Sequence, residues 1–304
     1  MNKGKMTALL LAILLLWFLP TTSWAGGWTL PKGRLWMKSA IFYQVTQKRF
    51  CSEQDAQSLA FREVGCTSAG HSAPFDPFIG GQSEALAIFT EVAYGATGWL
   101  DLGAQIPFYS LKFTNLANPN RPRNNSFGDI RFFAKYRVLQ QPVVASIMIA
   151  AKSPTGKFNV DAEVVNVSEG QWDVEFLGEM SRSFWPVRGY ASLGVGYRIR
   201  TDNDAFEHTM GDEFMMIFEA GYDLRPRVTI KGAVDWLRGE HPRLKANNVP
   251  LLERRELLTI TPSVIYAPRE GFGIEASVRF ALSGQDFPDG TQFMGALFYN
   301  FSVL

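Results

Sequence analysis

Charged residues that alternate with apolar ones are the residues of this chain best suited to contact a polar solute. In the segment 127–137, Asp129, Arg131 and Lys135 share one parity, and most residues of the other parity are apolar. Side chains of one parity point to the same face of a β-strand. We therefore expect these charges to line a wet interior, where they either pair as a static network or tune solute selectivity.

The same parity rule selects a larger set of candidate lumen residues. The charged candidates are Lys38, Glu91, Asp101, Asp129, Arg131, Lys135, Asp173, Glu175, Arg198, Glu219, Lys231, Asp235 and Arg279. The apolar candidates are Trp36, Phe42, Phe89, Phe133 and Tyr190. The aromatic rings either form a track for hydrophobic solutes or fill space inside the wall.

Two cysteines, Cys51 and Cys66, lie 15 residues apart in one long connection. In an oxidising compartment an even pair of this kind indicates a disulfide, and two free thiols are the alternative. The closed loop would stabilise the fold by roughly 3 kcal/mol in the chain-entropy model. No metal site is expected, because His71 is the only nearby histidine and no spacing completes a zinc set.

Hydrolytic chemistry would need a nucleophile, a base and an orienting group within reach of one another. The three histidines, His71, His208 and His241, all fall in expected loops, and the only His–Ser neighbours are His71 and Ser72. No Gly-x-Ser-x-Gly motif is present. We therefore expect neither an enzyme nor a cofactor, with an outer-membrane lipid hydrolase as the less favoured alternative.

The elements that must position these residues are about twelve runs of roughly ten residues with period-2 patterning. The connections between the runs alternate between long and short. Long connections fall at about 46–82, 113–126, 153–170, 201–211, 239–252 and 283–291, and short ones near 95–98, 138–142, 184–189, 224–227 and 267–271. An even strand count with this asymmetry is typical of a bacterial outer-membrane barrel. We predict an all-β fold, a transmembrane antiparallel up-and-down β-barrel of about 12 strands.

Aromatic residues recur on the apolar face just before the short turns. They are Tyr94, Tyr136, Phe184, Tyr222 and Tyr266, and they predict a periplasmic aromatic girdle. One irregularity is Pro262, in the middle of a run. Because a closed barrel has no edge strand to accommodate a proline, we expect a bulge there.

The N-terminus has the features of a secretory leader. Two lysines precede an apolar run over about residues 8–19, and Ser23 and Ala25 fit a signal-peptidase site. The run is shorter than the roughly 20 residues that span a bilayer as a helix, so a membrane anchor is the weaker alternative. We predict a signal peptide at 1–25 and a single barrel domain at 26–304 in the outer membrane of a Gram-negative bacterium.

Charge and composition limit the partners. Without the leader, Lys+Arg falls from 30 to 28 against 29 Asp+Glu, so the net charge is near −1 and a nucleic-acid partner is not expected. We expect outer-membrane lipid and lipopolysaccharide, small solutes, and the barrel assembly machinery as partners. That machinery usually reads a C-terminal aromatic. This sequence departs from the pattern because it ends Val303-Leu304, and we expect Phe301 or Tyr299 to serve instead. Loop cations either contact lipopolysaccharide phosphates or are solvated: Arg121, Arg123, His241, Arg243 and Lys245.

Twelve strands predict a narrow lumen. Eight strands leave an interior filled by side chains, whereas sixteen or more leave an aqueous channel. The segment 26–33 ahead of the first strand is short, and we expect it to be too short to plug the barrel. A constriction must then come from lumen side chains or an infolded loop, for which the first long loop is the obvious candidate.

Several segments resemble the outer-membrane barrels of the meta-pathway of phenol degradation family. The resembling stretches are 27–33, 127–131, 135–137, 152–156, 170–184, 189–200 and 221–235. The resemblance implies an outer-membrane channel for aromatic or other hydrophobic compounds. The main alternative is a non-conducting surface scaffold or adhesin that displays the first loop.

Overall fold

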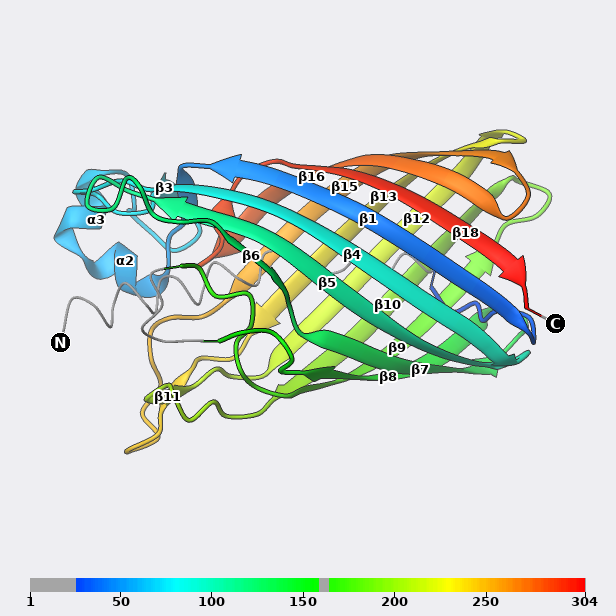
Figure 1. Cartoon of the computed structure of the whole chain (residues 1–304), viewed down its shortest axis with the longest axis horizontal. Helices are drawn as coiled ribbons and strands as arrows, with labels where there is room; N and C mark the ends of the chain where they lie inside the picture. Colours follow the sequence, from blue (N-terminus) through cyan, green and yellow to red (C-terminus); the bar gives the residue numbers. More distant parts are fainter. Residues whose placement is uncertain (1–25, 159–163, 304) are drawn as a thin grey trace.

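Twelve long antiparallel strands form a closed barrel in the computed structural model, which describes residues 26–158 and 164–303 (Figure 1). The strands are β1 (Arg34–Thr46), β4 (Gln82–Thr97), β5 (Leu100–Thr114), β7 (Ile130–Leu139), β8 (Val144–Ser153), β9 (Asp173–Ser183), β10 (Gly189–Arg200), β12 (Glu213–Arg225), β13 (Val228–Gly239), β15 (Glu256–Arg269), β16 (Phe272–Gln285) and β18 (Gln292–Ser302). Each strand pairs with the next one along the chain, and β1 pairs with β18 to close the ring. The predicted up-and-down barrel is confirmed.

Alternation along each strand separates the two surfaces of the barrel. In β1, the even residues from Trp36 to Thr46 are buried, while Met37, Ile41 and Tyr43 on the other face are exposed. An apolar outer face and an enclosed polar face are what a barrel in lipid requires. The predicted signal peptide at 1–25 lies outside the described residues.

The two ends of the barrel differ. The tight turns and the C-terminus lie at one end, and the long loops with their short helices lie at the other (Figure 1). We refer to these as the periplasmic and extracellular ends, following the loop asymmetry of such barrels. In the part of the chain that the structure describes, no helix is long and apolar enough to cross a membrane.

The first loop forms a small cap at the extracellular end. It contains β2 (Lys48–Phe50), α2 (Glu53–Gln57), α3 (Leu59–Glu63) and β3 (Ser72–Pro74). Strand β2 pairs with β3 on one side and with β17 (Pro288–Asp289) of the last loop on the other. The cap is therefore tied to a loop that lies far away in the sequence.

The aromatic residues of the predicted girdle lie near the periplasmic turns. Tyr136, Phe184, Tyr222 and Tyr266 are exposed on the outer face, and Tyr94 is partly exposed.

The expected bulge at Pro262 is wrong. Pro262 pairs with Gly232 of β13 in unbroken register, and the two register shifts of β15 fall at Leu258/Thr259 and at Tyr266/Arg269 instead. On the β16 side, Ile260 and Ser263 are paired in the same register while Thr261 and Pro262 between them have no partner, so the proline leaves a gap in this ladder without shifting it. A Cβ on Gly232 would meet nothing within 4 Å, which leaves space beside the proline ring.

Candidate functional site

One wall of the lumen is apolar and aromatic. It is formed by side chains of β1, β4 and β5 that are buried in one cluster: Ala40, Phe42, Ala85, Ala87, Phe89, Tyr109, Leu111 and Phe113. The ring of Phe89 lies edge-to-face against Phe42 and Tyr109, with centroids 5.1 and 5.7 Å apart. Such contacts are the preferred geometry of aromatic pairs. We call this surface the aromatic wall.

The other predicted apolar lumen residues lie elsewhere. Trp36 and Phe133 belong to a second cluster, which lies toward the periplasmic end and includes Leu30. Tyr190 donates its hydroxyl to Glu219 Oε1 at 2.6 Å. The five predicted rings therefore do not form one continuous track.

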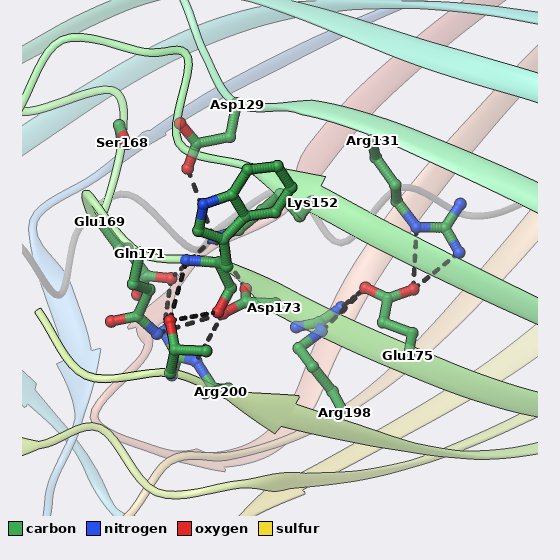
Figure 2. Close-up of polar contacts among 12 residues, drawn as sticks. Asp129, Arg131, Lys152, Ser168, Glu169, Gln171, Asp173, Glu175, Arg198 and Arg200 are labelled. Atoms are coloured by element: carbon green, nitrogen blue, oxygen red, sulfur yellow. Dashed lines mark hydrogen bonds and ion pairs between the residues drawn. The ribbon is translucent and has the colours of Figure 1, made fainter.

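The opposite wall carries a chain of ion pairs that runs from strand to strand (Figure 2). Glu175 on β9 accepts from Nε of Arg131 on β7 at 2.8 Å and from Nε of Arg198 on β10 at 2.9 Å. Arg198 Nη1 also bonds Glu213 on β12 at 2.5 Å. These bonds brace four strands across the lumen-facing surface.

The chain continues toward the extracellular end through Lys152 and Arg200. Lys152 Nζ lies 2.8 Å from Asp173, 3.3 Å from Glu169 and 3.4 Å from Asp129. Arg200 pairs with Glu169 through Nη2 and with Glu213 through Nη1, the latter at 3.2 Å. Figure 2 shows Asp129, Lys152, Glu169, Asp173 and Arg200 converging from separate elements.

Arg255, immediately before β15, completes this ion network. Its Nη1 lies 2.9 Å from Glu213 Oε1 and 3.8 Å from Glu169 Oε1. Sequence reasoning selected Asp129, Asp173, Glu175, Arg131 and Arg198 but not the residues that link them. Lys152, Arg200 and Glu213 have the lumen parity, and the alternation of their strands predicts that Arg200 and Glu213 face inward, although neither is among the candidate residues. Glu169 and Arg255 lie outside the strands, where parity gives no signal.

A separate charged group lies on the strands that close the barrel. Lys38 Nζ is 2.7 Å from Glu275 Oε2, and Lys231 Nζ is 2.9 Å from Glu275 Oε1 and 3.1 Å from Glu219. The structure therefore brings three predicted residues, Lys38, Glu219 and Lys231, together through Glu275, which was not among the candidates, and this group is apart from the ion network.

Three further predicted residues are paired locally. Arg279 Nη2 lies 3.8 Å from Asp235, which also accepts from Thr259 at 3.3 Å. Glu91 accepts from Gln105 Nε2 at 3.0 Å.

A segment of the third long loop, residues 164–171, crosses between the two walls. Val165 and Val167 are 2% and 3% exposed and pack within the aromatic wall. Glu169, 2% exposed, places its carboxylate among the cations of the ion network. The third loop thus enters the lumen, which the sequence did not predict. The first loop, which was the expected candidate, caps the barrel end and buries Phe50 and Phe75 against lumen-facing side chains there.

Local geometry fixes the direction of Glu169. Gly170 has φ +71°, a conformation that favours glycine, and a Cβ there would lie 2.6 Å from Asn203 Nδ2. Asn203 Nδ2 donates to the Glu169 carbonyl at 2.5 Å. Burial acts to raise the pKa of Glu169, but Arg200, Lys152 and Arg255 outweigh it, so the pKa lies below its usual value. The carboxylate is therefore ionised and held in place.

The segment 26–33 enters the periplasmic end of the lumen. The Gly26 carbonyl accepts from Lys135 Nζ at 2.6 Å, and the Leu30 N–H donates to both Asp101 oxygens at 3.1 Å. Trp28 packs edge-to-face on Tyr190 of β10, which is the sixth strand from β1 around a ring of twelve. The segment thus spans the lumen, and the expectation that it is too short is wrong: eight residues extend about 26 Å.

The disulfide between Cys51 and Cys66 is present, with its Cα atoms 5.9 Å apart, as predicted. Next to it, Arg49 pairs with Asp55 at 2.6 Å and with Asp286 of the last loop at 3.3 Å. These bonds connect the cap to the barrel mouth. Burial raises the pKa of Asp286 to about 7, in spite of the neighbouring Arg49.

Two of the three histidines, His71 and His241, form hydrogen bonds with neighbouring loop residues. His71 Nδ1 bonds Thr67 Oγ1 at 2.8 Å, and His241 Nδ1 lies 2.9 Å from the Leu251 carbonyl. Within 26–158 and 164–303, no group of three or more histidines, cysteines or carboxylates is arranged to hold a metal ion.

Comparisons with known proteins agree with this architecture. The family model described as MetA-pathway of phenol degradation matches residues 80–297. Among solved structures, an outer membrane channel from Pseudomonas putida F1 has 14% identity and a TM-score of 0.70, with 90% of this chain and 98% of that chain covered. The Pseudomonas putida toluene transporter TodX has 10% identity and a TM-score of 0.43, with 90% of each chain covered. No curated protein matches this sequence. The first of these structural likenesses shows the fold.

Proposed function

Because this chain belongs to the MetA-pathway of phenol degradation family, we propose that it is an outer-membrane channel for small aromatic or other hydrophobic solutes. The lumen that we propose is narrow and charged. The observation that carries the proposal is the pairing of an aromatic wall on β1, β4 and β5 with an ion network on the facing strands. A similar solved structure is named an outer membrane channel, which supports the same conclusion.

The lumen is closely filled between its two walls. One small cavity, of about 20 Å³, lies beside Phe42, Phe89 and Met294 and reaches Lys38 and Glu91. A second, of about 50 Å³, is lined by apolar and charged side chains that include Met148, Leu177, Leu237, Arg131 and Arg198. A cavity needs about 10–15 Å³ to hold one water, so these spaces fit waters and not an aromatic ring. We infer that a solute passes only when lumen side chains move, and not through a wide aqueous pore.

Two constrictions control this path in our proposal. Residues 26–33 narrow the periplasmic end and residues 164–171 narrow the middle of the lumen. The mature chain begins at Gly26 after cleavage near Ala25 and forms one domain, 26–304. Outer-membrane lipid surrounds the barrel, lipopolysaccharide contacts the long loops, and the assembly machinery inserts it. No catalytic role is part of the proposal.

Two measurements test the channel. The refolded mature chain in a planar bilayer should give discrete conductance steps. Cells that express it should take up labelled toluene and phenol faster than cells without it, and Phe89→Lys should reduce this uptake because it places a charge on the aromatic wall. Phe89→Leu, which keeps the wall apolar, is the matched control. A folded barrel that neither conducts nor speeds uptake would favour the scaffold or adhesin alternative.

A further inference from the structure

The ion network is electrically neutral only because a loop residue enters it. The ion pairs among the described residues join five cations, Arg131, Lys152, Arg198, Arg200 and Arg255, to five carboxylates, Asp129, Glu169, Asp173, Glu175 and Glu213. Nine of the ten lie on strands or immediately next to one. Glu169 alone comes from the infolded segment. Without its carboxylate, the ion pairs of the network would join five cations to four carboxylates.

Three cations surround the position of this carboxylate, and we call them the cationic cage. They are Lys152, Arg200 and Arg255. The cage has more donors than Glu169 uses, because the Nε atom of Arg255 is buried without a hydrogen-bond partner and that of Arg200 lies 3.7 Å from Asp173 Oδ1, beyond hydrogen-bond distance. Glu169 Oε1 is likewise buried without a hydrogen bond, at 3.8 Å from Arg255 Nη1. A freely placed carboxylate can bind a guanidinium through two parallel hydrogen bonds, which the tethered Glu169 does not achieve here.

The residues of 164–171 that precede Glu169 include apolar side chains, in contrast to its charged carboxylate. Four residues before Glu169, Val165 packs in the aromatic wall among Phe42, Phe89 and Tyr109, and Val167 lies beside it. The segment thus presents an apolar group to one wall and a carboxylate to the other. A small aromatic acid combines the same two groups within one molecule.

We propose that the cationic cage is a binding site for the carboxylate of an aromatic acid, and that Glu169 is the internal ligand that occupies it when no solute is bound. The solute ring contacts the aromatic wall, and its carboxylate replaces that of Glu169 so that the network stays neutral. This assignment rests on the proposed function for the route of the solute. Binding itself does not require conduction.

The test compares benzoate with toluene, which has a similar ring and no carboxylate. Glu169→Gln keeps the shape of the side chain but removes its negative charge. The three cations of the cage then have one negative partner fewer, which favours binding of the benzoate carboxylate. Calorimetric titration of the refolded full chain should show benzoate binding tightened by about tenfold or more, since hydrogen bonds to charged groups have that strength. Toluene binding should not change. Glu63→Gln, on the exposed surface of α3, is the matched control and should leave both unchanged.

A second measurement needs no variant. In the unmodified chain, benzoate should increase backbone hydrogen exchange in residues 164–171 because it displaces Glu169, whereas toluene should not. Benzoate binding that is no tighter in the Glu169→Gln chain, or exchange that does not respond to benzoate, would overturn the proposal. If the chain conducts but fails these tests, only the proposal of a carboxylate site in the cationic cage is overturned. If it binds benzoate as expected but neither conducts nor speeds uptake, only the proposed channel function is overturned.

Discussion

The backbone N–H of Gly27 donates a hydrogen bond to Ser181 Oγ, 2.7 Å away and 154 residues further along the chain. Ser181 in turn donates to Ser192 Oγ at 2.9 Å, so the segment 26–33 is fixed to β9 and β10 on the side of the barrel opposite β1. Space is tight at this point, because a Cβ on Gly26 would lie 1.9 Å from Ser181 Oγ and the residue has φ +61°. Residues 26–33 thus obstruct the periplasmic end.

Removal of that segment should open the periplasmic end. A chain that begins at Pro31 lacks Trp28 and Leu30, and we expect a larger single-channel conductance because the twelve wall strands remain intact. Ser181→Ala is the control, since it removes the hydrogen bonds to Gly27 and Ser192, each worth about 1 kcal/mol, but leaves the segment present. Equal conductance of the truncated and full-length chains would show that residues 26–30 do not limit flow.

Glu175→Gln should destabilise the barrel strongly. Its carboxylate accepts from both Arg131 and Arg198, so the neutral variant leaves two buried guanidiniums short of negative charge. Loss of one partner of a buried ion pair destabilises by about 3–5 kcal/mol. The urea concentration needed to unfold the barrel should fall accordingly, while Glu63→Gln on the surface should shift stability by no more than about 0.5 kcal/mol. Similar midpoints for the two variants would contradict a structural role of the network.

Loss of the disulfide should loosen the cap without weakening the barrel. Closure of a loop of this length stabilises by roughly 3 kcal/mol in the chain-entropy model, and both cysteines lie outside the strands. In the Cys51→Ala, Cys66→Ala double variant, trypsin should cleave after the exposed Arg62 faster than in the parent chain. The temperature at which the barrel unfolds in detergent should stay the same. Unchanged cleavage would mean that packing alone holds the cap.

The contact between cap and barrel should weaken as pH rises. Burial raises the pKa of Asp286 to about 7, above the value near 3.9 expected in an unfolded chain. The folded state therefore binds this proton more tightly, so the stabilisation is complete below about pH 4 and is lost as pH rises through 7. Hydrogen exchange in residues 47–57, corrected for its intrinsic pH dependence, should be faster at pH 8 than at pH 6.

Asp286→Asn provides the control for this pH effect. An amide does not titrate, so the difference in protection between pH 6 and pH 8 should disappear. A variant that keeps the full difference would assign the effect to another group near Arg49, such as Glu253, whose pKa burial also raises.

The sequence by itself determined the barrel, its twelve strands, the face of each strand and the Cys51–Cys66 disulfide. These features are local, because period-2 alternation and connection length act within about ten residues of chain. The tertiary structure alone decided which loop enters the lumen, how residues 26–33 cross it, and how β15 accommodates Pro262 opposite Gly232. It also brought Glu169 to Arg200 and Arg255, from elements 31 and more residues apart. Loop residues carry no periodic signal, and their positions depend on partners that meet only when the barrel closes.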